Sequence, residues 1–258
     1  MILSNKYKIL RTITKSTYST LYEGEHIIKK SRVAIKIESD ETCKKLLDNE
    51  IRLYLYLKKG KHNISIPNIK DIGIFDNYSY IVMELLNKNL KQKIEEGLEP
   101  KDFLKIIKEL FILIQNFHYR DLVHRDIKPE NFVFNKENKL CIIDLGLSCL
   151  NDRRELRHFI GNKLYSSFNC HLDNYIYNKT DDLISIIYML LHLYTGILPW
   201  STAYVSYKIK RECNLELFYK EANDKIVDLL IFIYKNIGNY YFYNYVFNEI
   251  IKTEKFFN

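Results

Sequence analysis

Up to Leu86, the chain alternates apolar and polar positions in short runs. This period of two predicts β-strands with one buried face. The runs are Tyr7 to Ile13, Thr20 to Ile27, Arg32 to Glu38, Ile69 to Phe75 and Tyr78 to Leu85. Between the third and fourth runs, apolar residues follow helical spacing over about Glu41 to Leu57, and Gly60 then ends the pattern. We therefore expect one helix within an otherwise β region.

Beyond Leu86 the spacing of apolar residues becomes mainly helical. Pro100 is expected to open a long amphipathic helix. Its apolar face consists of Phe103, Ile106, Ile107, Leu110, Ile114 and Phe117. A short strand pair is then predicted over Asn131 to Asn135 and Lys139 to Asp144, with mostly helix afterwards. No linker rich in Pro, Gly or Ser separates the parts, so the change near Leu86 to Leu90 predicts a hinge between lobes, not a tether.

Composition is typical of a globular protein that can bury a core. The chain has 258 residues, of which 47% are hydrophobic and 28% are charged. Its net charge of +7 suits nucleic acid, a membrane or an acidic or phosphorylated protein, and a solvated basic surface is an equal alternative. The most apolar segment, Leu183 to Pro199, contains His192 and Thr195 and is short for a bilayer span. We interpret it as a buried core helix and expect no membrane partner.

The cysteines indicate a reducing environment. There are five, Cys43, Cys141, Cys149, Cys170 and Cys213, and no two form a C-x-x-C pair. This pattern disfavours a disulfide framework and a zinc site. The start of the chain, Met1 to Lys8, has no long apolar stretch, so we expect no signal peptide. We expect a cytoplasmic protein; entry into the nucleus stays open, although no clear basic signal supports it.

The strongest local pattern runs from His124 to Asn131 and reads His-Arg-Asp-Ile-Lys-Pro-Glu-Asn. It matches the catalytic-loop pattern H-R-D-x-K-x-x-N. The Asp126 carboxylate would accept the proton of an attacking hydroxyl, and Lys128 would reach a transferring phosphoryl group. The Asn131 amide would bind a metal ion. A charged surface turn is the alternative, and the number of matched positions disfavours it.

A second pattern, Ile142 to Gly146, reads Ile-Ile-Asp-Leu-Gly. It resembles the D-F-G metal motif, with Leu in place of Phe. Asp144 follows an apolar strand, where a carboxylate can hold Mg²⁺ against phosphates, and Gly146 permits a sharp turn. Alone, Asp-x-Gly after a strand is an ordinary turn. Its position thirteen residues after Asn131 favours the metal site.

A third pattern, Val-Ala-Ile-Lys, ends at Lys36. Strand alternation places Ala34 and Lys36 on one face, which suits a nucleotide with its base against Ala34 and its phosphates on Lys36. Glu50 lies fourteen residues later in the predicted helix, where it can pair with Lys36. Taken alone, the lysine reads as an exposed strand residue and the glutamate as a surface helix residue.

Together these residues resemble the eukaryotic protein kinases, and more narrowly the casein kinase 1 family, over nearly the whole chain. The narrower resemblance rests on the hinge-like Val82 to Leu86, on Gly161 to Leu172 in place of an A-P-E motif, and on Asp181 to Leu183 and Leu198 to Trp200. It implies an α+β, two-lobed kinase fold and a single catalytic domain over 1–258. A small, mainly antiparallel β lobe with one helix would span 1–86, and a larger, mainly helical lobe 87–258.

The resemblance also implies ATP and Mg²⁺ in the cleft between the lobes. Asn131 and Asp144 would hold the metal, and Asp182 would anchor the backbone of the catalytic loop. For Asp182 the alternative is a favourable carboxylate at a helix N-terminus beside Thr180. The backbone of Glu84 and Leu86 would bind adenine, and Met83 would be the gatekeeper. The nucleotide-contacting residues would be Ile13, Leu21, Ala34, Lys36, Glu50, Met83, Glu84, Leu86 and Val133.

The family favours Ser or Thr sites preceded by acidic or phosphorylated residues. Cations that would suit such substrates are Arg153, Arg154, Arg157, Lys163 and Lys179. A solvated basic surface explains them equally well. We accordingly expect protein substrates, no specific nucleic-acid partner and a monomer.

The chain departs from the family most clearly in its phosphate loop. The three glycines of G-x-G-x-x-G are replaced by Thr14, Ser16 and Ser19. Because glycines let the backbone approach phosphates, we expect weaker ATP binding or slower turnover but not loss of activity. The β-branched Thr14 is expected to fit worst. Asn162 stands where the family has a Thr, and we expect modest damage there. The chain stops at Asn258, soon after the last predicted helix, so no regulatory tail is expected.

Three functions fit these observations to different degrees. An active Ser/Thr protein kinase is favoured, because the charged and metal-binding positions are all filled. A pseudokinase that binds nucleotide with little or no turnover is the alternative that the lost glycines support. A kinase-fold enzyme acting on a small molecule is disfavoured by the family-like segment from Asn162 to Leu172.

Overall fold

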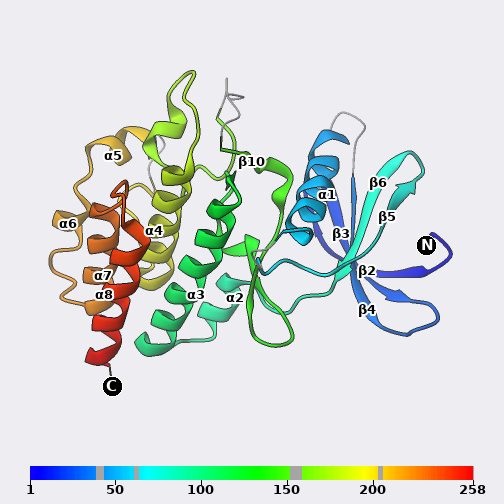
Figure 1. The fold of residues 1–258 in the computed structure, drawn as a ribbon, viewed down its shortest axis with the longest axis horizontal. Coiled ribbons are helices and arrows are strands. Elements are labelled where there is room, and N and C mark those ends of the chain that lie inside the picture. Colours follow the sequence, from blue (N-terminus) through cyan, green and yellow to red (C-terminus); the bar gives the residue numbers. More distant parts are fainter. Residues whose placement is uncertain (39–43, 61–63, 152–158, 203–205, 258) are drawn as a thin grey trace. The chain divides into compact units, whose positions relative to one another are not determined.

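The computed structural model describes residues 1–38, 44–60, 64–151, 159–202 and 206–257. Within them the chain divides into two compact units (Figure 1). The first consists of Met1–Lys88 and Phe132–Ser148, and the second of Asn89–Asn131 and Cys149–Asn258.

The first unit is built on a six-stranded antiparallel sheet with strand order β1-β2-β3-β4-β6-β5. The strands are β1 (Ile2–Leu3), β2 (Tyr7–Lys15), β3 (Ser19–His26), β4 (Arg32–Glu38), β5 (Ile69–Phe75) and β6 (Tyr78–Glu84). The bounds of β4 and β5 are those predicted from the alternation. The two-residue β1 was not predicted, because so short a run carries no period.

One face of this sheet is apolar, and the opposite face carries the charged lysine of β4. Val33 and Ile35 are buried in a cluster with Leu3, Tyr80 and Val82. The alternation predicted for β4 is therefore present, and it leaves Lys36 on the other face. Burying each of these large apolar side chains contributes about 1.5–3 kcal/mol to folding.

Helix α1 (Lys44–Lys58) and a small hairpin complete the first unit. The predicted helix start at Glu41 lies outside the described residues, and the predicted end at Leu57 agrees within one residue. The hairpin pairs β8 (Phe132–Phe134) with β9 (Leu140–Ile142), as the sequence pattern predicts. A 3₁₀ turn, η3 (Leu145–Leu147), follows β9 and packs against α1.

The second unit is mainly helical. Its helices are α2 (Leu90–Glu95), α3 (Pro100–Tyr119), α4 (Lys179–Thr195), α5 (Ser206–Glu212), α6 (Leu215–Phe218), α7 (Lys225–Lys235) and α8 (Phe242–Phe256). Its short elements are the strand pair β7 (Leu122–Val123) and β10 (Cys149–Leu150), and the 3₁₀ turns η2 (Pro129–Asn131) and η4 (Phe168–His171). Helix α3 buries the apolar face predicted for it.

Helix α4 carries most of the most apolar segment of the chain, and its residues Ser185 to Leu191 are all buried. It packs against α7, and α7 packs against α8. The segment is thus a core helix, as predicted. Within the described ranges, no helix is both long and apolar enough to pass through a bilayer. A mainly antiparallel sheet unit and a mainly helical unit agree with the predicted α+β class.

Candidate active site

Three charged side chains meet in the first unit. The Nζ of Lys36, on β4, lies 2.6 Å from Oε2 of Glu50 on α1 and 2.8 Å from Oδ1 of Asp144, just after β9. Glu50 is buried, whereas the side chain of Asp144 is 41% exposed. The contact predicted between the lysine and the glutamate is therefore present, and the aspartate joins it.

Burial and ion pairing act in opposite directions on these groups. Burial lowers the pKa of Lys36, but the charges of Glu50 and Asp144 outweigh burial, and the pKa is raised above its usual value. Burial raises the pKa of Glu50, and the charge of Lys36 opposes that rise. The lysine therefore stays protonated, which a group that binds phosphate oxygens requires.

The segment after β9 makes a sharp turn against α1. Asp144 has φ 59° and ψ 61°, a left-handed conformation that costs a residue other than glycine about 1–3 kcal/mol. At Gly146, an added Cβ would lie 3.3 Å from the carbonyl oxygen of Leu46. The turn fits closely on the helix because residue 146 has no side chain.

The residues expected to bind adenine all belong to the first unit. Ala34 pairs with Met83 across β4 and β6, and Leu21 pairs with Lys36 across β3 and β4. Val133 lies on β8. Ala34, Met83 and Val133 are buried, Leu21, Glu84 and Leu86 are partly buried, and Ile13 is exposed.

Backbone hydrogen bonds within the first unit hold the segment after β6, which the sequence predicts to be a hinge. The amide of Glu84 donates to the carbonyl of Asn68 at 2.8 Å. The amide of Asn87 donates to the carbonyl of Phe134 on β8 at 2.8 Å. These bonds fix the backbone on both sides of Leu86, the position expected to bind adenine through its main chain.

A serine hydroxyl holds the turn that stands in place of the glycine-rich loop. Ser16 Oγ donates to the carbonyl of Ser19 at 3.0 Å and accepts from the amides of Tyr18 and Ser19 at 3.3 and 3.1 Å. Residues 14–19 are all described, and none has a positive φ. Thr14 pairs with Leu21 in the β2–β3 ladder, beside a register irregularity between Thr12 and Thr14.

The catalytic-loop residues meet in the second unit. Lys128 Nζ pairs with Oδ2 of Asp126. Asn131 Nδ2 donates to the Asp126 carbonyl at 2.8 Å and to its Oδ2 at 3.1 Å. Because both donors meet the same carboxylate oxygen, the Asp126 side chain is held in one orientation.

Asp182, at the start of α4, binds the backbone of this loop. The amides of His124 and Arg125 donate to its carboxylate at 2.7 and 3.1 Å, and His118 Nε2 lies 3.1 Å from Oδ2. The Tyr177 hydroxyl adds a bond of 2.8 Å. Burial raises the pKa of Asp182, but hydrogen bonds from His118 and the His124 amide outweigh burial, and the pKa is lowered. The carboxylate is thus a buried, ionised acceptor for the loop.

The segment that starts at Gly161 touches the catalytic loop directly. Gly161 has φ 92°, and a Cβ there would lie 2.1 Å from the carbonyl oxygen of Arg125. Asn162 Oδ1 accepts from the amides of Leu164 and Tyr165 at 2.8 and 3.2 Å, so it caps its own segment. Sequence reasoning included Gly161 only as part of a family-like stretch, because its spacing does not reveal which backbone it approaches.

Lys210, on α5, is a buried lysine that the sequence analysis missed. Its Nζ donates to the carbonyls of Lys163 and Ser166 at 2.6 and 2.7 Å and lies 5.5 Å from the centre of the Trp200 ring. Burial lowers its pKa to about 7, while the carbonyl acceptors favour its protonated form. In the sequence it stands among other cations, Lys208 and Arg211, and nothing separates it from an exposed lysine.

His171 contacts Ser166, the residue whose carbonyl also binds Lys210. Its Nε2 is 3.0 Å from Ser166 Oγ, and its ring stacks on Phe159 with centroids 4.6 Å apart. Burial and the charge of Lys210 lower the pKa of His171 to about 4. The ring is therefore neutral near pH 7, and its Nε2 shares a hydrogen bond with the Ser166 hydroxyl.

The cations expected to contact acidic substrates are only partly described. Outside the described residues lie Arg153, Arg154 and Arg157. Lys163 is exposed, and Lys179 Nζ lies 2.6 Å from Asp121 Oδ1. Lys179 is therefore engaged locally.

The donor atoms at the two predicted metal ligands fit Mg²⁺. Asp144 offers a partly exposed carboxylate, and Asn131 uses its Nδ2 inside the loop, so its Oδ1 is the atom for a cation. Mg²⁺ prefers such oxygen ligands and is commonly held by one or two protein groups together with phosphates. In the described parts of the chain, no three His, Cys, Asp or Glu residues form a metal cage, and an ion bound partly by phosphates needs none.

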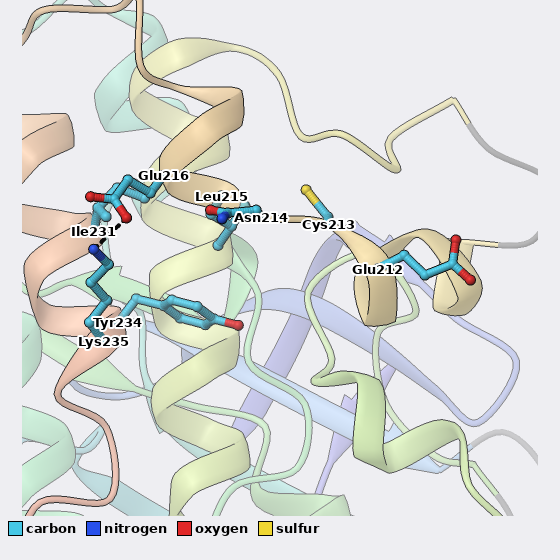
Figure 2. Close-up of a pocket in the computed structure, with 8 residues that line it drawn as sticks. All are labelled: Glu212, Cys213, Asn214, Leu215, Glu216, Ile231, Tyr234 and Lys235. Atoms are coloured by element: carbon cyan, nitrogen blue, oxygen red, sulfur yellow. Dashed lines mark hydrogen bonds and ion pairs between the residues drawn. The ribbon is translucent and has the colours of Figure 1, made fainter.

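A separate cavity of about 310 Å³ lies in the second unit and contains none of the predicted site residues (Figure 2). It is lined by Glu212, Cys213, Asn214, Leu215, Glu216, Ile231, Tyr234 and Lys235. Lys235 pairs with Glu216 at its edge. Burial raises the pKa of the Cys213 thiol, which disfavours the reactive thiolate.

Comparison with known families identifies one match over most of the chain. The family model described as the protein kinase domain matches residues 7–232. The match includes the charged cluster of the first unit, the catalytic loop and Asp182.

Proposed function

Because this chain belongs to the protein kinase domain family, we propose that it is an active Ser/Thr protein kinase. It transfers the γ-phosphoryl group of ATP to protein hydroxyls with the help of Mg²⁺, and it forms a single catalytic domain over 1–258. The observation that carries the proposal is the fixed carboxylate of Asp126, held by Lys128 and Asn131 and backed by Asp182. A chain kept only as a scaffold has no need of this arrangement.

The reaction joins the hydroxyl oxygen of the substrate to the γ-phosphorus and breaks the bond from that phosphorus to the β–γ bridging oxygen, with ADP as the leaving group. Asp126 accepts the hydroxyl proton. Lys128 lies beside Asp126 and stabilises negative charge on the transferred group. Bound Mg²⁺ would neutralise phosphate charge, with Asp144 and Asn131 as its protein ligands.

In the first unit, Lys36 binds the phosphates, and Glu50 keeps its side chain extended for that contact. Ala34, Met83 and Val133 supply buried apolar surface for adenine. Leu21 and Ile13 complete the apolar surface, and the Glu84 and Leu86 backbone supplies hydrogen bonds. The serine-held turn between β2 and β3 covers the phosphates less closely than glycines would, so we expect weaker ATP binding or slower turnover.

We propose the casein kinase 1 family as the subfamily, with Ser or Thr sites near acidic or phosphorylated residues as substrates. The basic composition, with a net charge of +7, and the exposed Lys163 support this preference. The alternative is a nucleotide-binding pseudokinase. The loss of all three loop glycines favours it.

The test is transfer of labelled phosphate from ATP to casein, an acidic protein, in the presence of Mg²⁺. The parent chain is compared with Asp126→Asn and with Asp228→Asn, an exposed aspartate on α7. We expect phosphoserine or phosphothreonine from the parent and from Asp228→Asn. The Asp126→Asn variant should lose at least about 100-fold in rate, because it lacks the proton acceptor.

Nucleotide titration separates the remaining outcomes. Binding of ATP without transfer to casein or to basic control proteins would support the pseudokinase. Equal rates for the parent and Asp126→Asn would contradict the assignment of that carboxylate. Phosphotyrosine as the product would overturn the Ser/Thr specificity.

A further inference from the structure

The side-chain amide of Asn49, on α1, contacts three carbonyl groups in the segment that follows Asp144. Its Nδ2 lies 2.9 Å from the carbonyl oxygen of Gly146, 2.9 Å from that of Ser148 and 3.4 Å from that of Leu145. One amide group therefore spans the whole of η3. These contacts link positions 96 to 99 residues apart in the sequence.

The chemistry of the contact fixes the orientation of the Asn49 amide. An amide NH₂ carries two hydrogens, and the two shorter contacts, to Gly146 and Ser148, use both. All three neighbours are carbonyl oxygens, so the opposite orientation would place the Asn49 oxygen against them. A side chain without N–H donors would leave these partly buried acceptors without this partner.

The contact acts on the most strained part of the cluster. Asp144 has a left-handed backbone conformation and has to be held there by its surroundings. Asn49 binds the residues directly after Asp144, while its neighbour Glu50 binds the Lys36 that contacts Asp144. Asn49 thus holds the backbone that follows Asp144. The next residue of the helix, Glu50, holds Lys36, whose charge attracts the Asp144 carboxylate.

We infer that Asn49 is a positioning residue that fixes the Asp144 carboxylate for the metal–nucleotide. The consequence for the metal rests on the proposed function. The consequence for the backbone of Leu145–Ser148 does not, since it follows from the hydrogen bonds alone.

The test compares Asn49→Leu, which removes the donors at similar size, with Asn49→Asp, which turns an anion toward the carbonyl oxygens. Leu3→Ala serves as the control, because Leu3 is fully buried in the apolar cluster of the same unit and belongs to neither the site nor α1. Amide hydrogen exchange over 145–150 is measured by mass spectrometry. ADP affinity is measured by calorimetry in excess Mg²⁺ and again in EDTA.

In both Asn49 variants, the amides of 145–150 should exchange faster than in the parent. In Leu3→Ala they should exchange at the parental rate, provided that each protein is measured the same number of degrees below its own melting temperature. The gain in ADP affinity from Mg²⁺ should fall by roughly tenfold in the Asn49 variants, as for the loss of an outer-shell partner of a metal ligand. Affinity in EDTA should change less than about twofold. Asp144→Asn gives the reference for complete loss of the Mg²⁺ effect.

Parental exchange rates over 145–150 in both Asn49 variants would overturn the inference. Equal losses with Mg²⁺ and with EDTA would also overturn it, because they would show general damage to the unit. If the parent shows no effect of Mg²⁺ on ADP binding, the proposed function fails on that point. The exchange data then decide the role of Asn49 alone.

Discussion

Gly161 approaches Arg125 so closely that a Cβ on residue 161 would lie 2.1 Å from the Arg125 carbonyl oxygen. Such a contact is far inside van der Waals distance, and the φ of 92° adds strain for any side chain. The segment from Gly161 onward can therefore lie against the catalytic loop only while residue 161 is glycine. Sequence spacing alone does not distinguish this glycine from one in an ordinary turn.

We predict that Gly161→Ala is much more harmful than alanine at another left-handed glycine. Gly238 has the same φ of 92°, with no atom within 4 Å of an added Cβ. Gly238→Ala should cost about 1 kcal/mol of stability from backbone strain alone. Gly161→Ala should cost about 3 kcal/mol or displace the catalytic loop. Urea unfolding and phosphotransfer rates measure both effects, and equal losses for the two variants would contradict the close contact.

We predict that Asp182→Asn destabilises the second unit by about 3 kcal/mol, because an amide cannot accept all the bonds that the buried carboxylate now accepts. The change also turns an NH₂ group toward the His124 and Arg125 amides. Asp228→Asn, an exposed substitution on α7, is the control and should change stability by less than about 0.5 kcal/mol. Denaturant titration of both variants gives the comparison. A small effect at 182 would mean that water or another acceptor replaces the carboxylate.

We predict that His171 makes the protein less stable in mild acid. Its pKa is about 4 in the folded chain, against 6.5 for an ordinary histidine. Between these values the unfolded chain binds a proton that the folded chain does not, so stability falls as the pH drops from 6.5 to 4. The loss attributable to this half-buried ring is about 1–2 kcal/mol after solvent screening.

His171→Phe removes the titrating group and keeps a ring to stack on Phe159 and Tyr207. Melting temperatures of the parent and the variant are measured from pH 7 to pH 4, and that of the parent should fall relative to that of the variant as the pH drops toward 4. A constant difference over this range would show that His171 contributes no pH dependence.

We predict opposite effects on binding and stability when glycines are restored to the phosphate loop. The triple variant Thr14→Gly, Ser16→Gly, Ser19→Gly lets the backbone come nearer to phosphates, and ATP affinity should rise by roughly three- to tenfold. It also removes the Ser16 hydroxyl bonds, so stability should fall by about 1–2 kcal/mol. Ser16→Ala alone separates the two effects, since it removes the hydroxyl without adding backbone freedom. An unchanged ATP affinity in the triple variant would show that the serine-held turn is no handicap.

Several elements of the fold follow from the sequence, because their burial pattern is periodic. The β4 and β5 bounds match the predicted runs, and α3 buries the predicted face. Helix α2 was missed because six residues give too little period. Its capping box, Asn89 with Gln92, is nonetheless visible in the sequence as Asn-x-x-Gln.

In the candidate site, too, some contacts could be predicted from sequence motifs, whereas others depend on tertiary packing. The pairing of Lys36 with Glu50 could be predicted only because the catalytic-loop and Asp-Leu-Gly motifs are also present, since each residue taken alone resembles an exposed one. The amide bridge of Asn49 and the carbonyl bonds of Lys210 depend on how distant segments pack. Neither residue type is unusual at its position in the sequence, so only the three-dimensional arrangement reveals them.

The hydroxyl-held turn between β2 and β3 has a thermodynamic consequence. A glycine-rich loop samples many conformations and loses that freedom when it closes over a nucleotide, whereas the turn around Ser16 is already ordered by its own hydrogen bonds. Nucleotide binding should therefore carry a smaller entropic penalty here and a smaller enthalpic gain from phosphate contacts. A kinase built this way would bind ATP with an affinity that changes less with temperature than that of a relative with a flexible loop.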